Sequence, residues 1–147
     1  MIATLFTTGL LVFAAVLIHL EALRRLSDLL PKLPTNPRLS VGVLGAILAH
    51  LLEIVVFSLG IYLLDTSPNH GKLVGAVEGG QYDYFYYSMV SYTSLGFGDI
   101  RPTGSLRLLT GMETLTGLVL IAWTASFMYV QMQRFWIDSN DDHTSKK

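Results

Sequence analysis

Three long runs of apolar residues, separated by polar stretches, set the pattern of this chain. The first occupies residues 1–20 and contains no Asp, Glu, Lys or Arg, and the others occupy residues 41–64 and 104–134. A helix of about 20 apolar residues crosses the hydrocarbon core of a bilayer, so each run predicts a membrane-spanning helix. A signal peptide is the alternative for the first run, but the basic residues that open a signal peptide are missing before it.

Residues 82–93 form a shorter apolar stretch, rich in tyrosine, between the second and third runs. This stretch is too short to cross a bilayer and too apolar for a loop in water, so we expect a re-entrant helix. Such a helix is tolerated at membrane depth only where protein or a water-filled cavity surrounds it. The sequence therefore predicts an all-α membrane protein, with three transmembrane helices and one re-entrant helix in each subunit.

The basic residues predict an orientation in the cell membrane. Seven Lys and Arg residues lie in the loop at 21–40 and at or beyond the end of the third run, against three in the segment 65–107. Loops rich in Lys and Arg stay in the cytoplasm, so we expect the loop 21–40 and the tail 137–147 inside, and the N-terminus and the segment 65–107 outside. The second half of the loop should be a non-helical connector because of its prolines, Pro31, Pro34 and Pro37.

The composition favours a membrane protein over a soluble enzyme. Hydrophobic residues make up 51% of the chain and charged residues 14%, whereas soluble domains carry about 25% charged residues. The net charge of −1 gives no reason to expect a nucleic-acid partner, and the sequence contains no cysteine for disulfides or thiol chemistry. We expect no enzymatic activity, no cofactor and no soluble partner.

The most informative motif is SYTSLGFGDIRPT at residues 91–103, in which Gly96 and Gly98 flank Phe97 and Asp99 follows. It resembles the selectivity filter of the tetrameric potassium channels, whose common form is TTVGYGD. The resemblance extends to a pore domain at 41–136, with an outer helix at 41–64, a pore helix at 82–93, the filter at 94–99 and an inner helix at 104–134. The first helix and its loop lie outside it.

The resemblance implies that backbone carbonyl oxygens replace the water shell of a potassium ion, the permeant ligand. Successive carbonyls point at one axis only if backbone conformations alternate, and glycine permits the conformations that other residues resist. On the family pattern the side chains of Leu95 and Phe97 pack behind the loop, and Thr93 and Asp99 support it. The ion-binding residues implied are Ser94, Leu95, Gly96, Phe97 and Gly98.

One chain supplies one loop, so the resemblance implies a homotetramer around a single axis in the lipid bilayer. Two positions depart from the common pattern. Ser94 replaces a threonine and Phe97 replaces a tyrosine, which removes a methyl group at the innermost site and a ring hydroxyl behind the filter. A weakly selective sodium and potassium channel is therefore the alternative to a potassium-selective one.

Four small or weakly polar residues share one face of the third run, because they recur at spacings of three and four: Val119, Ala122, Ser126 and Val130. This face either lines a water-filled cavity or packs against another helix. Gly117 is either a hinge or a position of close packing. We expect a hinge, because the inner helices of the potassium channels that this sequence resembles often bend there.

Three ionisable residues lie inside the second and third runs. His50 and Glu53 share a helix face, and Glu113 should reach a similar depth. They either form a cluster that senses pH or binds a metal ion, or brace the pore helix through Ser91, Tyr92 or Thr93, which we favour. A membrane metal-binding protein built on His50, Glu53 and Glu113 is the alternative from another functional class. His19 is expected at the cytoplasmic end of the first helix, with its polar tip at the interface.

Overall fold

The computed structural model describes residues 2–144, and for residues 35, 36 and 135–144 it describes the backbone alone. Helices dominate the described chain. It also has one pair of short antiparallel strands, which we call the hairpin although a helix separates them in the sequence. The elements in order are α1 (Ile2–Leu29), a 3-10 turn η1 (Leu30–Lys32), α2 (Thr35–Thr66), β1 (Leu73–Gly75), α3 (Gln81–Tyr92), β2 (Ile100–Pro102) and α4 (Leu106–Thr144).

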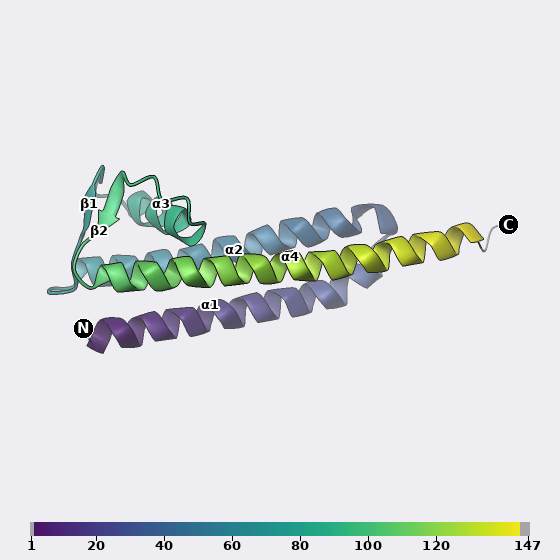
Figure 1. Ribbon diagram of the computed structural model, residues 1–147, viewed down its shortest axis with the longest axis horizontal. Coiled ribbons are helices and arrows are strands. Elements are labelled where there is room, and N and C mark those ends of the chain that lie inside the picture. Colours follow the sequence, from purple (N-terminus) through teal and green to yellow (C-terminus); the bar gives the residue numbers. More distant parts are fainter. Residues whose placement is uncertain (1, 145–147) are drawn as a thin grey trace.

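The helices α1, α2 and α4 run side by side along the long axis of the molecule (Figure 1). Three stretches, the first of which includes η1, are long and apolar enough to cross a membrane: Ile2–Lys32, Pro37–Thr66 and Leu106–Arg134. The short helix α3 and the hairpin lie together beside one end of this bundle, and the C-terminal end of α4 extends past the other end. The predicted fold class is confirmed: the protein is helical, with three spanning helices and one short helix between the second and third.

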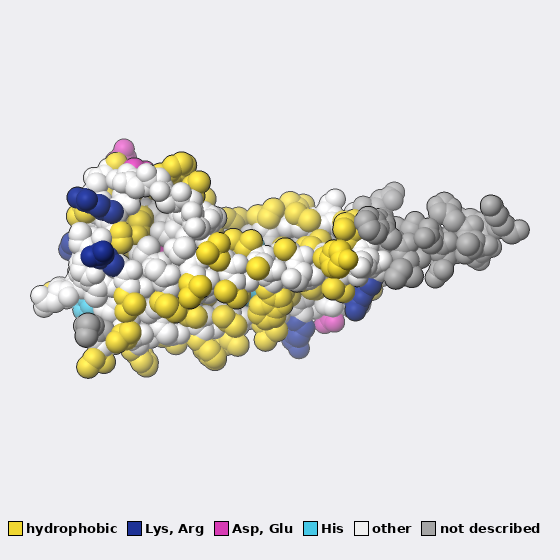
Figure 2. Space-filling model, viewed as in Figure 1, with side chains coloured by type: hydrophobic (Ala, Val, Ile, Leu, Met, Phe, Trp, Pro, Cys, Tyr) yellow, Lys and Arg dark blue, Asp and Glu magenta, His cyan; other side chains and the backbone are white. Residues whose placement is uncertain are grey.

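Apolar side chains cover the long helices on the outside as well as between them. Figure 2 shows hydrophobic side chains along the length of the bundle, with Lys and Arg gathered toward its two ends. Leu10, Leu48 and Leu118 are 56%, 65% and 48% exposed. An apolar surface of this extent is unusual for a soluble monomer and suits contact with lipid or with further subunits.

The predicted loop at 21–40 is wrong, because most of it is helical. The helix α1 continues to Leu29 and α2 begins at Thr35. Glu21 accepts hydrogen bonds from Arg24 at 3.0 Å and from Arg25 at 2.7 Å, and pairs at these spacings stabilise an exposed helical turn beyond the apolar run. Pro37 falls in the first turn of α2, where the missing N–H costs no hydrogen bond.

The predicted C-terminal tail at 137–147 also begins inside a helix. The backbone of α4 is helical to Thr144, and residues 145–147 lie outside the described part of the chain. The predicted pore helix at 82–93 corresponds to α3, Gln81–Tyr92, within one residue at each end.

The segment 65–81, between α2 and α3, contains β1, which pairs antiparallel with β2. Leu73 lies opposite Pro102 and Gly75 opposite Ile100. At the end of α2, Asp65 accepts hydrogen bonds from the Leu73 backbone N–H at 2.7 Å and the Tyr84 hydroxyl at 2.9 Å. The hairpin therefore joins the chain before α3 to the chain after the glycine motif, and Asp65 fastens β1 and α3 to the end of α2.

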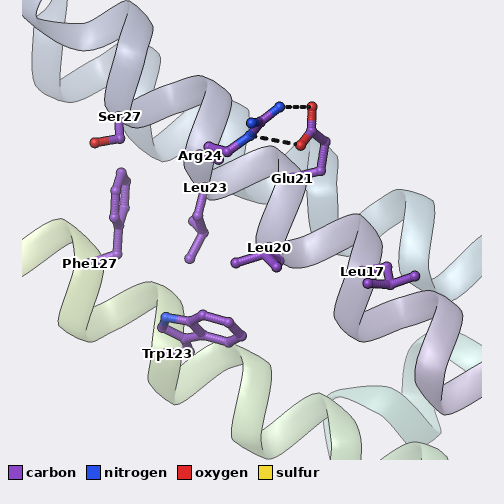
Figure 3. A pocket seen from close by; sticks show the side chains of 8 residues that line it. All are labelled: Leu17, Leu20, Glu21, Leu23, Arg24, Ser27, Trp123 and Phe127. Atoms are coloured by element: carbon purple, nitrogen blue, oxygen red, sulfur yellow. Dashed lines mark hydrogen bonds and ion pairs between the residues drawn. The ribbon is translucent and has the colours of Figure 1, made fainter.

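The first helix packs against both α2 and α4. Near the N-terminus Thr4 and Ser105 share a hydrogen bond of 2.9 Å between their hydroxyls. Farther along, a groove between α1 and α4 is lined by leucines of α1 and by two aromatic rings of α4, Trp123 and Phe127, with the Glu21–Arg24 pair at its rim (Figure 3). The additional helix is therefore an integral part of the bundle.

Candidate functional site

The start of α3 is fixed by a single carboxylate. One oxygen of Asp83 accepts hydrogen bonds from the backbone N–H groups of Glu78, Gly79 and Gly80, at 2.9, 2.8 and 3.2 Å. These donors lie in the turn before the helix, and a negative charge in the first helical turn also interacts favourably with the helix dipole. The carboxylate thus holds the turn against the first residues of α3.

The end of α3 leads directly into residues 93–99, which we call the glycine motif. The Leu95 backbone N–H donates to the Val90 carbonyl at 3.0 Å, and the Thr93 hydroxyl donates to the Met89 carbonyl at 2.8 Å. From α4, the Thr114 hydroxyl donates to the Ser91 carbonyl at 2.9 Å. These bonds satisfy carbonyls that a helix leaves unpaired at its C-terminal end. The Thr93 hydroxyl thus closes the last turn of the helix, at the start of the glycine motif.

The backbone of the motif alternates between two conformations. Ser94, Gly96 and Gly98 have positive φ angles of 61°, 54° and 82°, whereas Leu95 and Phe97 do not. A regular alternation of this kind turns successive carbonyls toward the same side. The left-handed conformation costs an L-residue roughly 1–2 kcal/mol, and glycine avoids that cost. Ser94 adopts it despite its side chain, which the sequence pattern did not predict.

The motif is uncovered in the single chain. Residues 93–99 are all exposed, and Leu95 and Phe97 are 56% and 65% exposed. The side chains expected to pack behind the loop therefore have no cover within their own subunit. Two large apolar side chains beside an exposed backbone suit an interface with further copies of the chain.

Asp99 is held in place at the C-terminal end of the motif by two hydrogen bonds. The Tyr86 hydroxyl donates to one of its oxygens at 2.8 Å, and the Ile100 backbone N–H donates to the other at 3.0 Å. The hydrogen bond from Tyr86 lowers the pKa of the Asp99 carboxyl, since it stabilises the charged form. Asp99 thus keeps its negative charge beside the loop. No sequence motif singled out Tyr86.

A buried hydrogen-bond network lies behind the end of α3. Glu53 on α2 is completely buried. Its two oxygens lie 2.9 Å from Nδ1 of His19 and 3.1 Å from Nδ1 of His50, and the Tyr92 hydroxyl donates to the second oxygen. On α4 the Thr124 hydroxyl lies 3.0 Å from Nε2 of His50 and 3.3 Å from Nε2 of His19. We call these five residues the histidine network.

The expected place of His19 at the cytoplasmic end of the first helix is wrong. His19 is fully buried and its ring packs against those of His50 and Trp123, with centroids 5.2 and 5.3 Å apart. The cause is the extension of α1 to Leu29, which places residue 19 well inside the bundle. The sequence offered a weak signal: His19 occupies a spanning run, where ionisable residues are often functional.

Glu113 does not join His50 and Glu53 as the cluster hypothesis required. It is fully buried and its Oε1 is hydrogen-bonded to the Ser88 hydroxyl on α3. Ser88 also donates to the Ile54 carbonyl at 2.9 Å. The single hydroxyl hydrogen cannot serve both acceptors, so a protonated Glu113 that donates to Ser88 completes the set. Both Glu53 and Glu113 thus contact α3, as the bracing hypothesis expects, with Ser88 as an unforeseen partner.

Three ligand-type side chains of the network, His19, His50 and Glu53, lie close enough for one metal ion, within 4.8 Å of one another. Every one of these groups already has a hydrogen-bond partner inside the network. Hydrogen bonding therefore accounts for their proximity without a metal ion.

The inner-helix residues expected on one face are accessible. Val119, Ala122, Ser126 and Val130 are exposed in the single chain, so this face of α4 is open to a cavity or to another subunit. Gly117 is a position of close approach: an added Cβ would lie 2.2 Å from the Tyr92 carbonyl oxygen. Because α4 is continuous through this position, the structure supports close packing of Gly117 and shows no hinge there.

A comparison with protein families finds one relation. The family model described as an ion channel matches residues 49–134, which is more than half of the 147-residue chain. The matched segment contains most of α2, the whole of α3, the glycine motif and α4 as far as Arg134, but not α1. No curated protein and no solved structure matches the chain.

The close approach at Gly117 predicts the effect of a single methyl group. Gly117→Ala should lower the melting temperature in detergent, because the Tyr92 carbonyl is backbone and cannot turn aside. Gly111→Ala on the same helix is the matched control, since an added Cβ there has no neighbour within 4 Å and alanine favours a helix by about 1 kcal/mol. Equal melting temperatures for the two variants would contradict the close packing.

The contact of Glu113 with Ser88 predicts different effects of two substitutions. Glu113→Gln keeps a donor for Ser88 and should reduce stability little. Glu113→Leu removes every hydrogen bond and should cost about 1–3 kcal/mol. Thermal unfolding in detergent would measure both, with Glu78→Gln in the exposed turn before α3 as a control. Equal losses for Gln and Leu would refute the bracing role.

Proposed function

Because the chain belongs to the ion channel family, we propose that it forms a passive channel that conducts potassium in preference to other ions. The carbonyls of residues 94–98 form its filter. The alternating backbone of the glycine motif is the observation that carries this proposal. Positive φ angles recur at Ser94, Gly96 and Gly98. Carbonyls aimed to one side in this way are the ligands that replace the water shell of potassium in such pores.

The pore requires several copies of the chain, and we propose four. One loop supplies one side of an ion site, and a closed ring of identical loops requires rotational symmetry. The exposure of Leu95 and Phe97 supports an assembly in which the neighbouring subunit covers them. The accessible face of α4, with Val119, Ala122, Ser126 and Val130, then lines the cavity below the filter.

The end of α3 contributes an electrostatic term. A helix C-terminus carries about half a negative charge, and α3 ends at Tyr92, directly before the motif. Four such ends around one axis would stabilise a hydrated cation in the cavity. The charge of Asp99 on the other side of the filter acts in the same sense at the outer mouth.

We further propose that the hairpin and the filter loop face the outside of the cell membrane. The basic residues support this orientation. Arg24 and Arg25 lie near the end of α1, at the opposite end of the bundle from the hairpin, and basic residues of short loops remain in the cytoplasm. The N-terminus then lies outside and the end of α4 inside.

Ion flux through the purified protein in liposomes tests the function. Potassium should flow well above the rate of empty liposomes, sodium more slowly and chloride not at all. Gly98→Ala should reduce potassium flux to the background, because a Cβ disfavours the left-handed conformation at φ 82°. Gly111→Ala, outside the motif, should conduct normally. Undiminished flux through Gly98→Ala would refute the filter assignment, and equal potassium and sodium flux would favour the weakly selective alternative.

The hydrogen bond between Tyr86 and Asp99 predicts a pH dependence. The Tyr86 hydroxyl lowers the pKa of Asp99, so the negative charge at the mouth should persist in moderate acid, and inward cation current should fall only when Asp99 is protonated. Tyr86→Phe removes the donor, raises that pKa and should shift the fall in current to higher pH. Tyr82→Phe is the control, since it keeps the ring that stacks on Tyr86 and leaves the Tyr86 hydroxyl in place. An identical pH profile for wild type and Tyr86→Phe would contradict this role.

A further inference from the structure

In the histidine network, the Nε2 atoms of two imidazole rings face one hydroxyl, that of Thr124. Glu53, when ionised, offers only acceptors. Its oxygens lie 2.9 Å from Nδ1 of His19 and 3.1 Å from Nδ1 of His50. Nδ1 of His50 also lies 2.9 Å from the Tyr92 hydroxyl, which donates its own hydrogen to Glu53. Both Nδ1 atoms therefore carry a hydrogen: His19 donates to the carboxylate, and His50 donates to the carboxylate or to the Tyr92 oxygen.

This assignment leaves both Nε2 atoms facing the same side chain. The Thr124 hydroxyl lies 3.0 Å from Nε2 of His50 and 3.3 Å from Nε2 of His19. A hydroxyl has one hydrogen and can donate it to one Nε2 only. The other Nε2 must then donate to the hydroxyl oxygen, and a ring with hydrogens on both nitrogens is an imidazolium. With Glu53 ionised, the hydrogen bonds are complete when the two histidines together hold one additional proton.

The balance of charge leads to the same count. The titratable groups that face Glu53 are His19 from α1, His50 from α2 and Tyr92 from α3. From α4 the two rings meet uncharged groups, the Thr124 hydroxyl and the Trp123 ring. Glu113, which is also completely buried, is bonded to Ser88. With Glu53 ionised and both histidines neutral, the network would bury one uncompensated negative charge at membrane depth, which is strongly unfavourable.

We propose that His19, His50, Glu53 and Thr124 form a proton-binding site, in which one proton taken from water is shared by the two imidazoles and neutralised by Glu53. Three donors to the carboxylate, from His19, His50 and Tyr92, favour its ionised form, so the proton resides on an imidazole. His50, whose side chain is 16% exposed, is the ring through which the proton exchanges with solvent.

The site gives α1 a specific part in the assembly. His19 lies outside the segment that matches the ion channel family, yet it completes a network that ends on Tyr92, the last residue of α3. When the proton is lost, one of the two Nε2 atoms has neither a hydrogen nor a donor, and Glu53 has no counter-charge. An uncompensated charge at this depth is strongly unfavourable, so the network that holds Tyr92 is destabilised and the filter loses part of its support. This consequence for current rests on the proposed channel function, whereas the proton site does not.

Counting ring hydrogens by nitrogen NMR tests the site directly. The full chain would be labelled with ¹⁵N-histidine in lipid bilayers, with His70→Gln and His143→Gln introduced so that His19 and His50 are the remaining rings. At neutral pH we expect three of the four ring nitrogens to be protonated. Two of four, which is the count for two neutral rings, or four of four would overturn the proposal. The count does not depend on conduction or on a change in the network.

Zinc retention tests the competing use of the same residues. The protein would be equilibrated with zinc, dialysed against zinc-free buffer and analysed for bound metal. We expect no retained zinc. One zinc ion per subunit, lost in His19→Gln, would overturn the proton site, because coordination would take the place of ring hydrogens.

Currents at increasing pH test the link to the filter. In wild type and in the control His70→Gln, current should fall several-fold as the NMR signature of the additional proton disappears. His19→Gln cannot hold the proton and should lack this pH-dependent step, whatever its absolute current. A step that persists in His19→Gln would overturn the link. Absence of current at every pH, with the proton count intact, would refute the channel function and leave the proton site standing.

Discussion

The end of α3 is buried inside the protein, where its polar groups must find partners, and this constraint organises the molecule around it. Each long helix supplies a partner. Glu53 of α2 binds Tyr92, His19 of α1 binds Glu53, and Thr114 of α4 binds the Ser91 carbonyl. Unsatisfied groups at this depth would each cost several kcal/mol, roughly the scale of the whole stability of a small domain. The cluster of polar side chains in an otherwise apolar bundle follows from this requirement.

The glycine motif inherits its position from that anchor. Its N-terminal end begins one residue after Tyr92, and its C-terminal end is held by Asp99, which binds Tyr86, and by β2, which pairs with β1. With both ends fixed, the intervening residues alternate in backbone conformation at the expense of a left-handed serine. Strain of this kind persists only where the surroundings determine the backbone. The exposed carbonyls and apolar side chains between the two anchors form the surface that assembly would complete.

The spanning helices, α3 and the motif could be predicted from the sequence, because run length, aromatic content and the two glycines are local signals. The extent of α1 could not, since the turn beyond residue 20 is stabilised by Glu21 with Arg24 and Arg25 rather than by apolar residues. That error misplaced His19. The partners of Glu53 and Glu113 depend on how helices rotate against one another, which a single sequence does not specify. The hairpin depends on pairing between segments separated by α3, and no hairpin turn motif marked it.

The central claim is that carbonyls of residues 94–98, contributed by four copies, surround potassium ions on one axis. A cryo-electron microscopy structure of the protein in lipid with potassium would test it most directly, with rubidium or thallium in a second sample to identify ions by their stronger density. The account predicts four subunits and a row of density on the axis between rings of backbone carbonyl oxygens. A different number of subunits, or an axis without ion density beside an ordered motif, would contradict it.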